Sequence, residues 1–143
     1  MKTILVTGGA GYIGTHTCIE LIEAGYDVVV VDNLSNSKPA AMERVEQIVG
    51  KKIPFYKNDI LDRTALDKIF AEHKIDAVIN FAGLKAVGES VAKPVEYYHN
   101  NITGLLVLVE AMRDAGCKNL VFSSSATVYG KPASVPITED FPL

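Results

Sequence analysis

The fold of this chain is decided by the stretch Thr7-Gly8-Gly9-Ala10-Gly11-Tyr12-Ile13-Gly14. The apolar run Ile4-Leu5-Val6 precedes it and an amphipathic run follows it. A strand that turns through glycines into a helix presents backbone N–H groups to a phosphate in parallel α/β sheets. We expect Gly8 to permit the tight turn, Gly11 to let a pyrophosphate approach the backbone, and Gly14 to let the helix pack close to the strand. Because glycine-rich turns are common and the spacing is G-x-x-G-x-x-G, the neighbouring elements and a later acidic residue have to support this interpretation.

Length, composition and charge restrict the class of protein. The 143 residues suffice for one domain with one core, and 48% apolar with 22% charged residues is ordinary for a globular protein. A net charge of -3 argues against a nucleic acid or an anionic membrane as partner. No apolar stretch reaches the roughly 18 residues of a membrane span, and the N-terminus has no signal-peptide layout, so we expect a cytoplasmic protein. Cys18 and Cys117 lack metal-ligand spacing, so we expect buried reduced thiols and no metal.

Hydrophobic periodicity predicts five short strands alternating with four helices. The strands are expected at residues 2–6, 27–31, 53–57, 77–79 and 119–122, and the helices at 12–24, 39–49, 63–73 and 94–115. Residues 84–93 and 130–143 are expected to be irregular, and Ser37 and Asp62 to cap the second and third helices. This alternation predicts an α/β fold, a Rossmann-like doubly wound parallel sheet whose right-handed crossovers favour the strand order 3-2-1-4-5. The centre of the last helix, residues 105–109, is apolar around most of its circumference, which indicates burial on more than one side.

The predicted topology places a ligand where the first and fourth strands end. Their carboxyl ends carry residues 8–14 and 81–83, and ligands of such sheets bind at this switch point. Asp32 ends the second strand, eighteen residues after Gly14. A carboxylate there accepts hydrogen bonds from both ribose hydroxyls of an adenosine and repels a 2′-phosphate, which favours NAD over NADP. The alternative is a solvated aspartate at the end of a strand, but together with the glycines and the strand pattern the cofactor interpretation is favoured.

Further polar residues lie at the same predicted edge, each with two open interpretations. Asp59 can meet an adenine or cap a turn, Lys85 can face the cofactor or solvent, and Asn100 can face the cofactor or solvent from its helix. Residues 123–125 and Thr127 carry hydroxyls at the end of the fifth strand, where they can hydrogen-bond a substrate oxygen or simply cap a loop. From the pattern alone, loop capping is the preferred interpretation.

These motifs together resemble the extended short-chain dehydrogenase/reductase family, and within it the UDP-hexose 4-epimerases. The residues that carry the resemblance are 6–17, 32–37, 73–76, 80–91, 93–94, 97–98 and 122–130. The glycine motif alone would match many enzymes of nucleotide-sugar metabolism. The runs 81–91 and 123–130 are narrower and favour the epimerases over the related dehydratases and decarboxylases. The resemblance extends over nearly the whole chain.

The resemblance implies a set of site residues and a reaction. The implied cofactor-binding residues are Gly8, Gly11, Tyr12, Ile13, Gly14, Asp32, Asn33, Leu34, Ser35, Asn36, Ser37, Asp59, Ile60, Phe81, Ala82, Gly83, Leu84, Lys85, Asn100 and Ser123. Lys85 and Ser125 are implied to bind substrate, Ser125 through the 4-oxygen of the sugar, with Thr127 in a supporting catalytic role. In this family NAD⁺ takes a hydride from carbon 4 of UDP-glucose or UDP-galactose, and the hydride returns to the other face of the 4-keto sugar.

The chain departs from the family at the catalytic base, which is the tyrosine of a Tyr-x-x-x-Lys motif. None of the six tyrosines is followed by lysine four positions later. The sequence ends at Leu143, before the catalytic helix and the substrate domain that the resemblance implies. We therefore expect residues 1–143 to be an incomplete NAD-binding domain that does not epimerise UDP-galactose alone. Two alternatives remain, a non-catalytic NAD-binding redox sensor and a fragment of a sugar-nucleotide dehydratase.

The family also implies a homodimer built on the helix predicted at 94–115. Without a neighbouring helix, the apolar centre at 105–109 would be partly uncovered, and the fifth strand would lie at an edge. We therefore expect this chain to self-associate through that surface.

Overall fold

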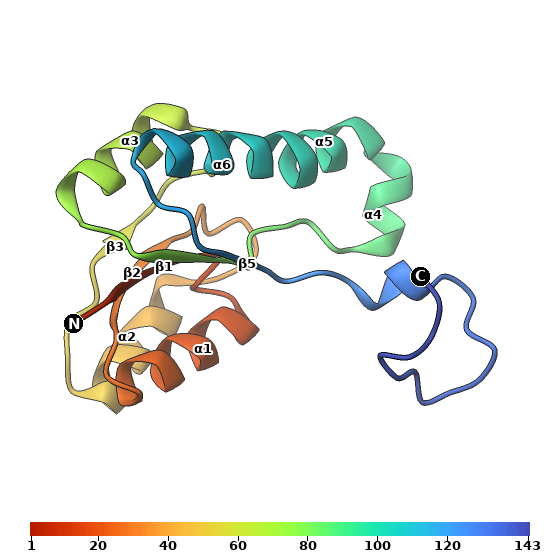
Figure 1. The fold of residues 1–143 in the computed structure, drawn as a ribbon, viewed down its shortest axis with the longest axis horizontal. Helices are drawn as coiled ribbons and strands as arrows, with labels where there is room; N and C mark the ends of the chain where they lie inside the picture. The colour runs from red at the N-terminus through yellow and green to blue at the C-terminus, as the bar shows by residue number, and fades with distance from the viewer.

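The computed structural model describes residues 1–143, which form a parallel sheet between two layers of helices (Figure 1). The strands are β1 (Thr3–Thr7), β2 (Asp27–Val31), β3 (Phe55–Tyr56), β4 (Ala77–Asn80) and β5 (Leu120–Phe122). Their order is β3-β2-β1-β4-β5, and every neighbouring pair is parallel. The predicted Rossmann-like sheet and its strand order are therefore confirmed.

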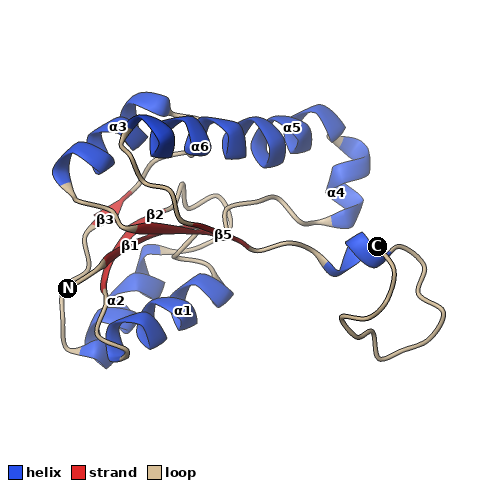
Figure 2. Ribbon diagram, in the orientation of Figure 1, coloured by secondary structure: helices blue, strands red, loops and turns tan.

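Helices cover both faces of this sheet, as Figure 2 shows. On one side lie α1 (Tyr12–Glu23) and α2 (Pro39–Val49), and on the other lie α3 (Arg63–Glu72) and α6 (Gly104–Asp114). The remaining helices, α4 (Val87–Ala92) and α5 (Pro94–Tyr98), lead into α6. No helix is long and apolar enough to cross a membrane.

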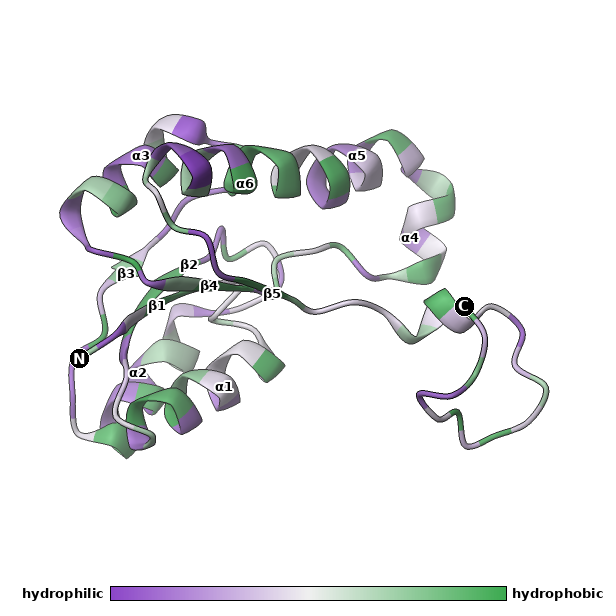
Figure 3. Cartoon of the chain, viewed as in Figure 1, coloured by the Kyte–Doolittle hydropathy of each residue, from purple (hydrophilic) through white to green (hydrophobic).

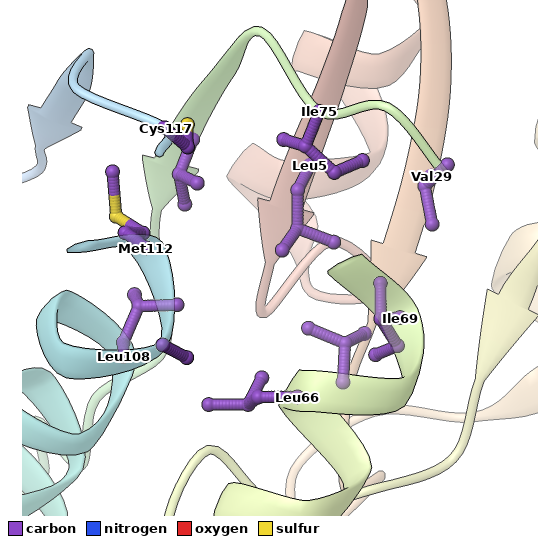
Figure 4. Packing of buried hydrophobic residues seen from close by; sticks show 11 residues of the cluster. Leu5, Val29, Leu66, Ile69, Ile75, Leu108, Met112 and Cys117 are labelled. Carbon is purple, nitrogen blue, oxygen red and sulfur yellow. The ribbon is translucent and has the colours of Figure 1, made fainter. Parts of the chain in front are cut away.

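Two buried clusters fill the space between the sheet and the helices. In β1 and β2, successive side chains alternate between the faces, so that Leu5 and Val29 face α3 and α6 while Ile4 and Val28 face α1 and α2. Figure 4 shows the first cluster, which contains Leu5 of β1, Leu66 and Ile69 of α3, and Leu108 and Met112 of α6. The central strands are hydrophobic along most of their length (Figure 3), as expected for a sheet buried on both faces.

The helix predicted at 94–115 is instead made of three parts. After α5, residues His99–Thr103 form a π-helical turn, and α6 begins at Gly104. A Cβ on Gly104 would lie 2.7 Å from Cδ1 of Ile60, so the helix approaches Ile60 closely where the π turn ends. Residues 87–92, expected to be irregular, form α4, which is separated from α5 by the non-helical backbone of Lys93 before Pro94.

Two predicted caps have different outcomes. Asp62 does cap α3, because its carboxylate accepts a hydrogen bond from the Ala65 N–H at 3.0 Å. The prediction for Ser37 is wrong, because Lys38 occupies the N-cap position of α2 and has no side-chain cap. Ser37 instead donates its hydroxyl to Asp32 at 3.2 Å.

The β5 side of the molecule is much more exposed than the centre. All three residues of β5 are exposed, and the chain after Phe122 leaves the sheet with only a short 3₁₀ turn at Ala126–Tyr129 (Figure 1). On α6, Leu108 is fully buried whereas Leu106 is 58% exposed and Val109 is 42% exposed. The expected edge position of the fifth strand and partial exposure of 105–109 are confirmed, and the apolar centre of α6 is not covered on all sides.

Candidate dinucleotide-binding site

A cavity of about 740 Å³ lies at the carboxyl ends of β1, β2 and β4. It is lined by 23 residues, which include every predicted cofactor-binding residue except Leu34 and Ser123. Sequence reasoning missed five of the lining residues: Val31, Asn58, Ala86, Glu89 and Tyr97. The cavity lies at the predicted switch point between β1 and β4.

The glycine turn holds β1, β4 and α1 at very short separations. Gly8 has φ +67°, and a Cβ there would lie 2.8 Å from the backbone nitrogen of Ala82. At Gly14 a Cβ would lie 2.7 Å from Cα of Gly9, so the first turn of α1 packs directly on the loop. These contacts confirm the expected tight turn at Gly8. Gly14 does allow close packing of the helix, but against the glycine turn rather than against the strand as expected.

The first turn of α1 faces the cavity with unpaired backbone donors. Gly11 is the N-cap residue and provides no side-chain cap. The N–H groups of Tyr12, Ile13 and Gly14 donate to no acceptor in the protein, and all three residues line the cavity. This arrangement of donors at a helix N-terminus suits an anionic group such as a pyrophosphate.

Asp32 connects the glycine turn to the loop after β2. Its Oδ2 accepts a hydrogen bond from the Ala10 N–H at 3.1 Å, and its Oδ1 accepts from the Leu34 N–H at 2.8 Å and from the Ser37 hydroxyl. A carboxylate oxygen accepts about two hydrogen bonds, so Oδ2 can accept one more from a ligand hydroxyl. The side chain is therefore fixed in orientation and still able to bind ribose.

The loop after β2 contains the one residue other than glycine with a positive φ. Leu34 has φ +58°, a left-handed conformation that costs about 1 kcal/mol for a residue with a Cβ. The hydrogen bond from its N–H to Asp32 holds this conformation, and its side chain packs against the core cluster that contains Val6. Leu34 thus shapes the loop without lining the cavity, unlike its neighbours Ser35 and Asn36.

Asp59 joins the loops that follow β2 and β3. Its Oδ2 accepts a hydrogen bond from Nδ2 of Asn33 at 3.0 Å, while its Oδ1 accepts from the Leu61 N–H at 2.9 Å. Asp59 therefore caps a turn and also lines the cavity beside Ile60. The two interpretations left open by the sequence are compatible.

The segment after β4 forms the opposite wall of the cavity, and residues Phe81–Lys85 all line it. Asn100 lines it from the π turn and donates its Nδ2 to Oδ1 of Asn101 at 3.0 Å. Beneath this wall, the buried Thr7 donates its hydroxyl to Oδ1 of the buried Asn80. Residues 80–91 carried the resemblance, but no local pattern distinguished Asn80 or Asn101 as structural polar residues.

The hydroxyl-bearing residues predicted after the fifth strand lie outside the cavity. Ser123, Ser125 and Thr127 follow the edge strand β5 and do not line it. The Ser125 hydroxyl oxygen accepts hydrogen bonds from the Thr127 N–H at 3.3 Å and from the Thr127 hydroxyl at 2.9 Å, and both residues are exposed. In this structure they cap a 3₁₀ turn, which is the simpler of the two interpretations. Their predicted contacts with cofactor and substrate stay predictions.

The two cysteines are free thiols in different clusters on opposite faces of the sheet. Burial raises the pKa of Cys18 to about 12, which disfavours its thiolate. The expected burial of both cysteines is confirmed. No group of three or more His, Cys, Asp or Glu residues is arranged to hold a metal ion.

A second cavity, of about 560 Å³, lies at the amino ends of β4 and β5. None of the predicted site residues lines it, and three of its polar residues already have partners in the protein. Asp76 accepts a hydrogen bond from the Thr3 N–H, Asn119 donates to the Asp76 carbonyl, and His73 contacts the Tyr56 hydroxyl. The larger cavity is therefore the better candidate for a functional site.

Comparison with known proteins tests the family suggested by these motifs. Residues 4–143 match the model of the NAD dependent epimerase/dehydratase family. The chain belongs to this family. Its fold, its glycine turn and its acidic residue at the end of β2 agree with the use of NAD that the family's description states.

Members of the epimerase/dehydratase family that resemble this chain include curated UDP-glucose 4-epimerases. The enzyme of Bacillus subtilis is 66% identical over 140 residues, which are 98% of this chain and 41% of the relative. The enzyme of Haemophilus influenzae is also 66% identical, over 137 residues. The chain thus spans 41% and 40% of the length of these two relatives.

Solved structures show the same similarity. UDP-glucose 4-epimerase from Bifidobacterium longum, in complex with NAD⁺ and UDP, has 59% sequence identity and a TM-score of 0.94, covering 99% of this chain and 42% of that chain. The enzyme from Stenotrophomonas maltophila, with bound NAD and formylated UDP-arabinopyranose, has 49% identity and a TM-score of 0.93, covering 99% of this chain and 42% of that chain. The similarity therefore extends over the whole candidate site.

Proposed function

We propose that residues 1–143 form the NAD-binding part of a UDP-glucose 4-epimerase. The observation that carries the proposal is the cavity in which the glycine turn, Asp32 and the Phe81–Lys85 segment meet. The relatives and the solved structures named above support the substrate class, UDP-glucose and UDP-galactose. A cytoplasmic location is part of the same proposal.

The residues that line the cavity fit a dinucleotide bound in one orientation, with its adenosine half near the loops after β2 and β3. The free N–H groups of Tyr12 and Ile13 would bind the pyrophosphate, and Oδ2 of Asp32 would accept a hydrogen bond from the adenosine ribose. Asp59 and Ile60 would contact the adenine, while the Phe81–Lys85 segment would lie along the other half of the cofactor. Bound NAD would supply a hydride acceptor for carbon 4 of the sugar.

The substrate would meet only a few residues of this chain. Lys85 would contribute a cation at the cavity, and Ser125 would donate a hydrogen bond to the 4-oxygen of the sugar. Thr127, which donates to Ser125, would orient that hydroxyl. Because no tyrosine in these residues has a lysine four positions later, we propose that this chain alone binds NAD without epimerising UDP-galactose.

Binding measurements on the purified chain test the proposal. Isothermal titration calorimetry should show NAD binding that is stronger than NADP binding, and Asp32→Ala should weaken NAD binding by about 10- to 100-fold, because a charged hydrogen-bond acceptor is lost. The matched control is Asp140→Ala, since Asp140 is exposed and makes no side-chain hydrogen bond. Equal binding of NAD by both variants would contradict the assigned role of Asp32.

An activity assay tests the second part of the proposal. In a coupled assay with UDP-galactose, the chain should turn over at least about 100-fold more slowly than a full-length epimerase, because acid–base catalysis is missing. Turnover near that of a full-length enzyme would contradict it.

We further propose that the chain self-associates through the exposed side of α6 and β5, as the family's homodimer suggests. Sedimentation velocity at high concentration should show a dimer or larger species, and Leu106→Glu should shift the distribution to the monomer. A wild-type chain that sediments as a monomer at every concentration would contradict this part.

A further inference from the structure

The segment between β4 and α4 is held by side chains at alternate residues. Three backbone N–H groups donate to them, that of Ala82 to Thr7, that of Leu84 to Asn101 and that of Ala86 to Tyr97. The N–H groups of Gly83 and Lys85 have no acceptor in the protein. One set of amides thus fixes the segment to the fold, and the other set is free to bind solvent or a ligand.

Tyr97 forms the last of these three attachments. Its side chain is buried, with 9% of the residue exposed, although it projects from the short helix α5. Its hydroxyl accepts a hydrogen bond from the Ala86 N–H at 3.2 Å and donates one to Oε2 of Glu89 at 2.9 Å. Burial, followed by the hydrogen bond to Glu89, raises the pKa of Tyr97, so the hydroxyl keeps its proton at neutral pH.

Helix α4, which begins directly after Ala86, has few other contacts that hold it in place. No residue of α4 is buried, and Val87 and Val91 are 76% and 80% exposed. The ion pair between Glu89 and Lys93, at 3.6 Å, lies in solvent and contributes little. The hydroxyl of Tyr97 is therefore the contact that fixes both the last residue before α4 and the first turn of α4.

Lys85 lies directly before the Tyr97 attachment. Its backbone is fixed on one side by Leu84 and on the other by Ala86. Its side chain folds back over Gly83, with Cε 3.6 Å from the position that a Cβ of Gly83 would occupy. This conformation places Lys85 in the lining of the large cavity.

We propose that Tyr97 is a positioning residue, whose buried hydroxyl fixes Ala86 and the start of α4 and so holds Lys85 against a bound dinucleotide. The proposal rests on the proposed function for its ligand but not for its geometry. Loss of the hydroxyl frees the Ala86 end of the segment, and the Lys85 side chain then samples positions away from the cavity.

Amide exchange in the chain without cofactor tests the attachment itself. Tyr97→Phe keeps the buried ring and removes the hydroxyl, so exchange of the Ala86 N–H should become about 5-fold faster while that of Leu84, held by Asn101, stays unchanged. The matched control is Tyr98→Phe, the adjacent tyrosine, which is exposed and makes no hydrogen bond through its hydroxyl. Unchanged exchange at Ala86 in Tyr97→Phe would overturn the proposal.

Glu89 provides a second set of variants that leaves the buried ring untouched. Glu89→Gln retains an acceptor for the Tyr97 hydroxyl and should keep the slow exchange at Ala86, whereas Glu89→Ala should speed it. In Tyr97→Phe, the nuclear Overhauser contacts between Gly83 and the Lys85 side chain should weaken. Full retention of these contacts would show that Lys85 does not depend on Tyr97.

A double-mutant cycle separates positioning from general structural support. Tyr97→Phe should weaken NAD binding about 3- to 10-fold in the wild-type background and much less in Lys85→Ala, because the two residues act through one contact. Additive losses would overturn the proposal. If the wild-type chain binds no NAD, the proposed function fails for this chain, while the exchange and Overhauser measurements still decide the role of Tyr97.

Discussion

The two halves of the sheet, the one that contains β2 and the one that ends at the edge strand β5, differ in how completely they are covered by helices and neighbouring strands. On one side, Val28–Val31 of β2 lie between β1 and β3 and under helices on both faces, and all four are buried. On the other side, β5 has one neighbouring strand, and its central residue, Val121, is 58% exposed. Two predominantly apolar strands thus have very different environments, because their position in the sheet decides how far they are covered.

The candidate site follows the same division. At the β2 end, Asp32 is hydrogen-bonded to Ala10 of the glycine turn, and Asn33 is hydrogen-bonded to Asp59. At the β5 end, Ser125 and Thr127 hydrogen-bond mainly to each other and lie outside the cavity. The contacts expected to determine cofactor affinity are therefore already formed within this chain, whereas the group expected to meet the sugar is not held in place.

The largest difference should appear between the two faces of one helix on the less covered side. Leu108→Ala removes a fully buried side chain of α6 and should cost about 2–5 kcal/mol of unfolding free energy. Leu106→Ala, two residues earlier on the exposed face, should change it by less than about 0.5 kcal/mol at concentrations where the chain is monomeric. Urea unfolding of both variants under these conditions measures the difference. Equal losses in the monomer would contradict the exposure of Leu106.

Alanine substitutions at Gly14 and Gly88 compare the packing of the glycine turn with that of α4. Gly14→Ala places a Cβ against Gly9 and should destabilise the chain by about 1–3 kcal/mol, because backbone atoms surround it. Gly88→Ala has no neighbour within 4 Å and lies in α4, so it should be neutral or slightly stabilising. Thermal unfolding of the two variants checks this. A stable Gly14→Ala protein would contradict the close packing of α1 on the turn.

The central fold was predictable because its signals are local. The continuous apolar run of β2 and the glycine turn each predict an element without reference to the rest of the chain, and the rules of crossover handedness then give the strand order. Asp32 could be found in the same way, since it directly follows the buried run. The failure at α4 is also local, because six residues that include Gly88 and precede Lys93 and Pro94 carry too little helical pattern.

The parts that the sequence did not predict depend on contacts between distant residues. Tyr97 and Tyr98 are identical in type and adjacent, yet one is buried against Ala86 and the other is exposed. Ser37 is a residue type that often caps helices, but its hydroxyl instead donates a hydrogen bond to the Asp32 carboxylate. No periodicity distinguishes these outcomes, because each is decided by where another loop lies.

The capping side chains of Asp62 and Ser125 allow the same comparison with smaller expected losses of unfolding free energy. Asp62→Ala removes the N-cap of α3 beside the buried core and should cost about 1 kcal/mol. Ser125→Ala removes the cap of an exposed 3₁₀ turn after β5 and should cost less than about 0.5 kcal/mol. Chemical unfolding measures both. A loss at Ser125 as large as that at Asp62 would show that the region after β5 unfolds together with the core.

The smallest effect expected is a change in how the stability of the protein depends on pH, through Glu46 of α2 in the well-covered half of the sheet. Oε1 of Glu46 accepts a hydrogen bond from the Ile53 N–H at 2.9 Å, and Oε2 pairs with Lys52 at 2.6 Å. These two interactions, that of Ile53 first, hold the pKa of Glu46 below its ordinary value, so its contribution to stability is present above about pH 4.5 and is lost as the pH falls through the lowered pKa. Glu46→Gln keeps the acceptor for Ile53 and removes the titration.

The melting temperature of the wild type should therefore exceed that of Glu46→Gln near pH 6, and the difference should shrink toward pH 3. Glu23→Gln is the control, because Glu23 is exposed and makes no side-chain hydrogen bond, and its difference from the wild type should not vary with pH in this way. A Glu46→Gln difference that stays constant from pH 6 to pH 3 would mean that Glu46 acts through its hydrogen-bond geometry alone. The carboxylate charge would then add nothing to the attachment that holds the start of β3 against α2.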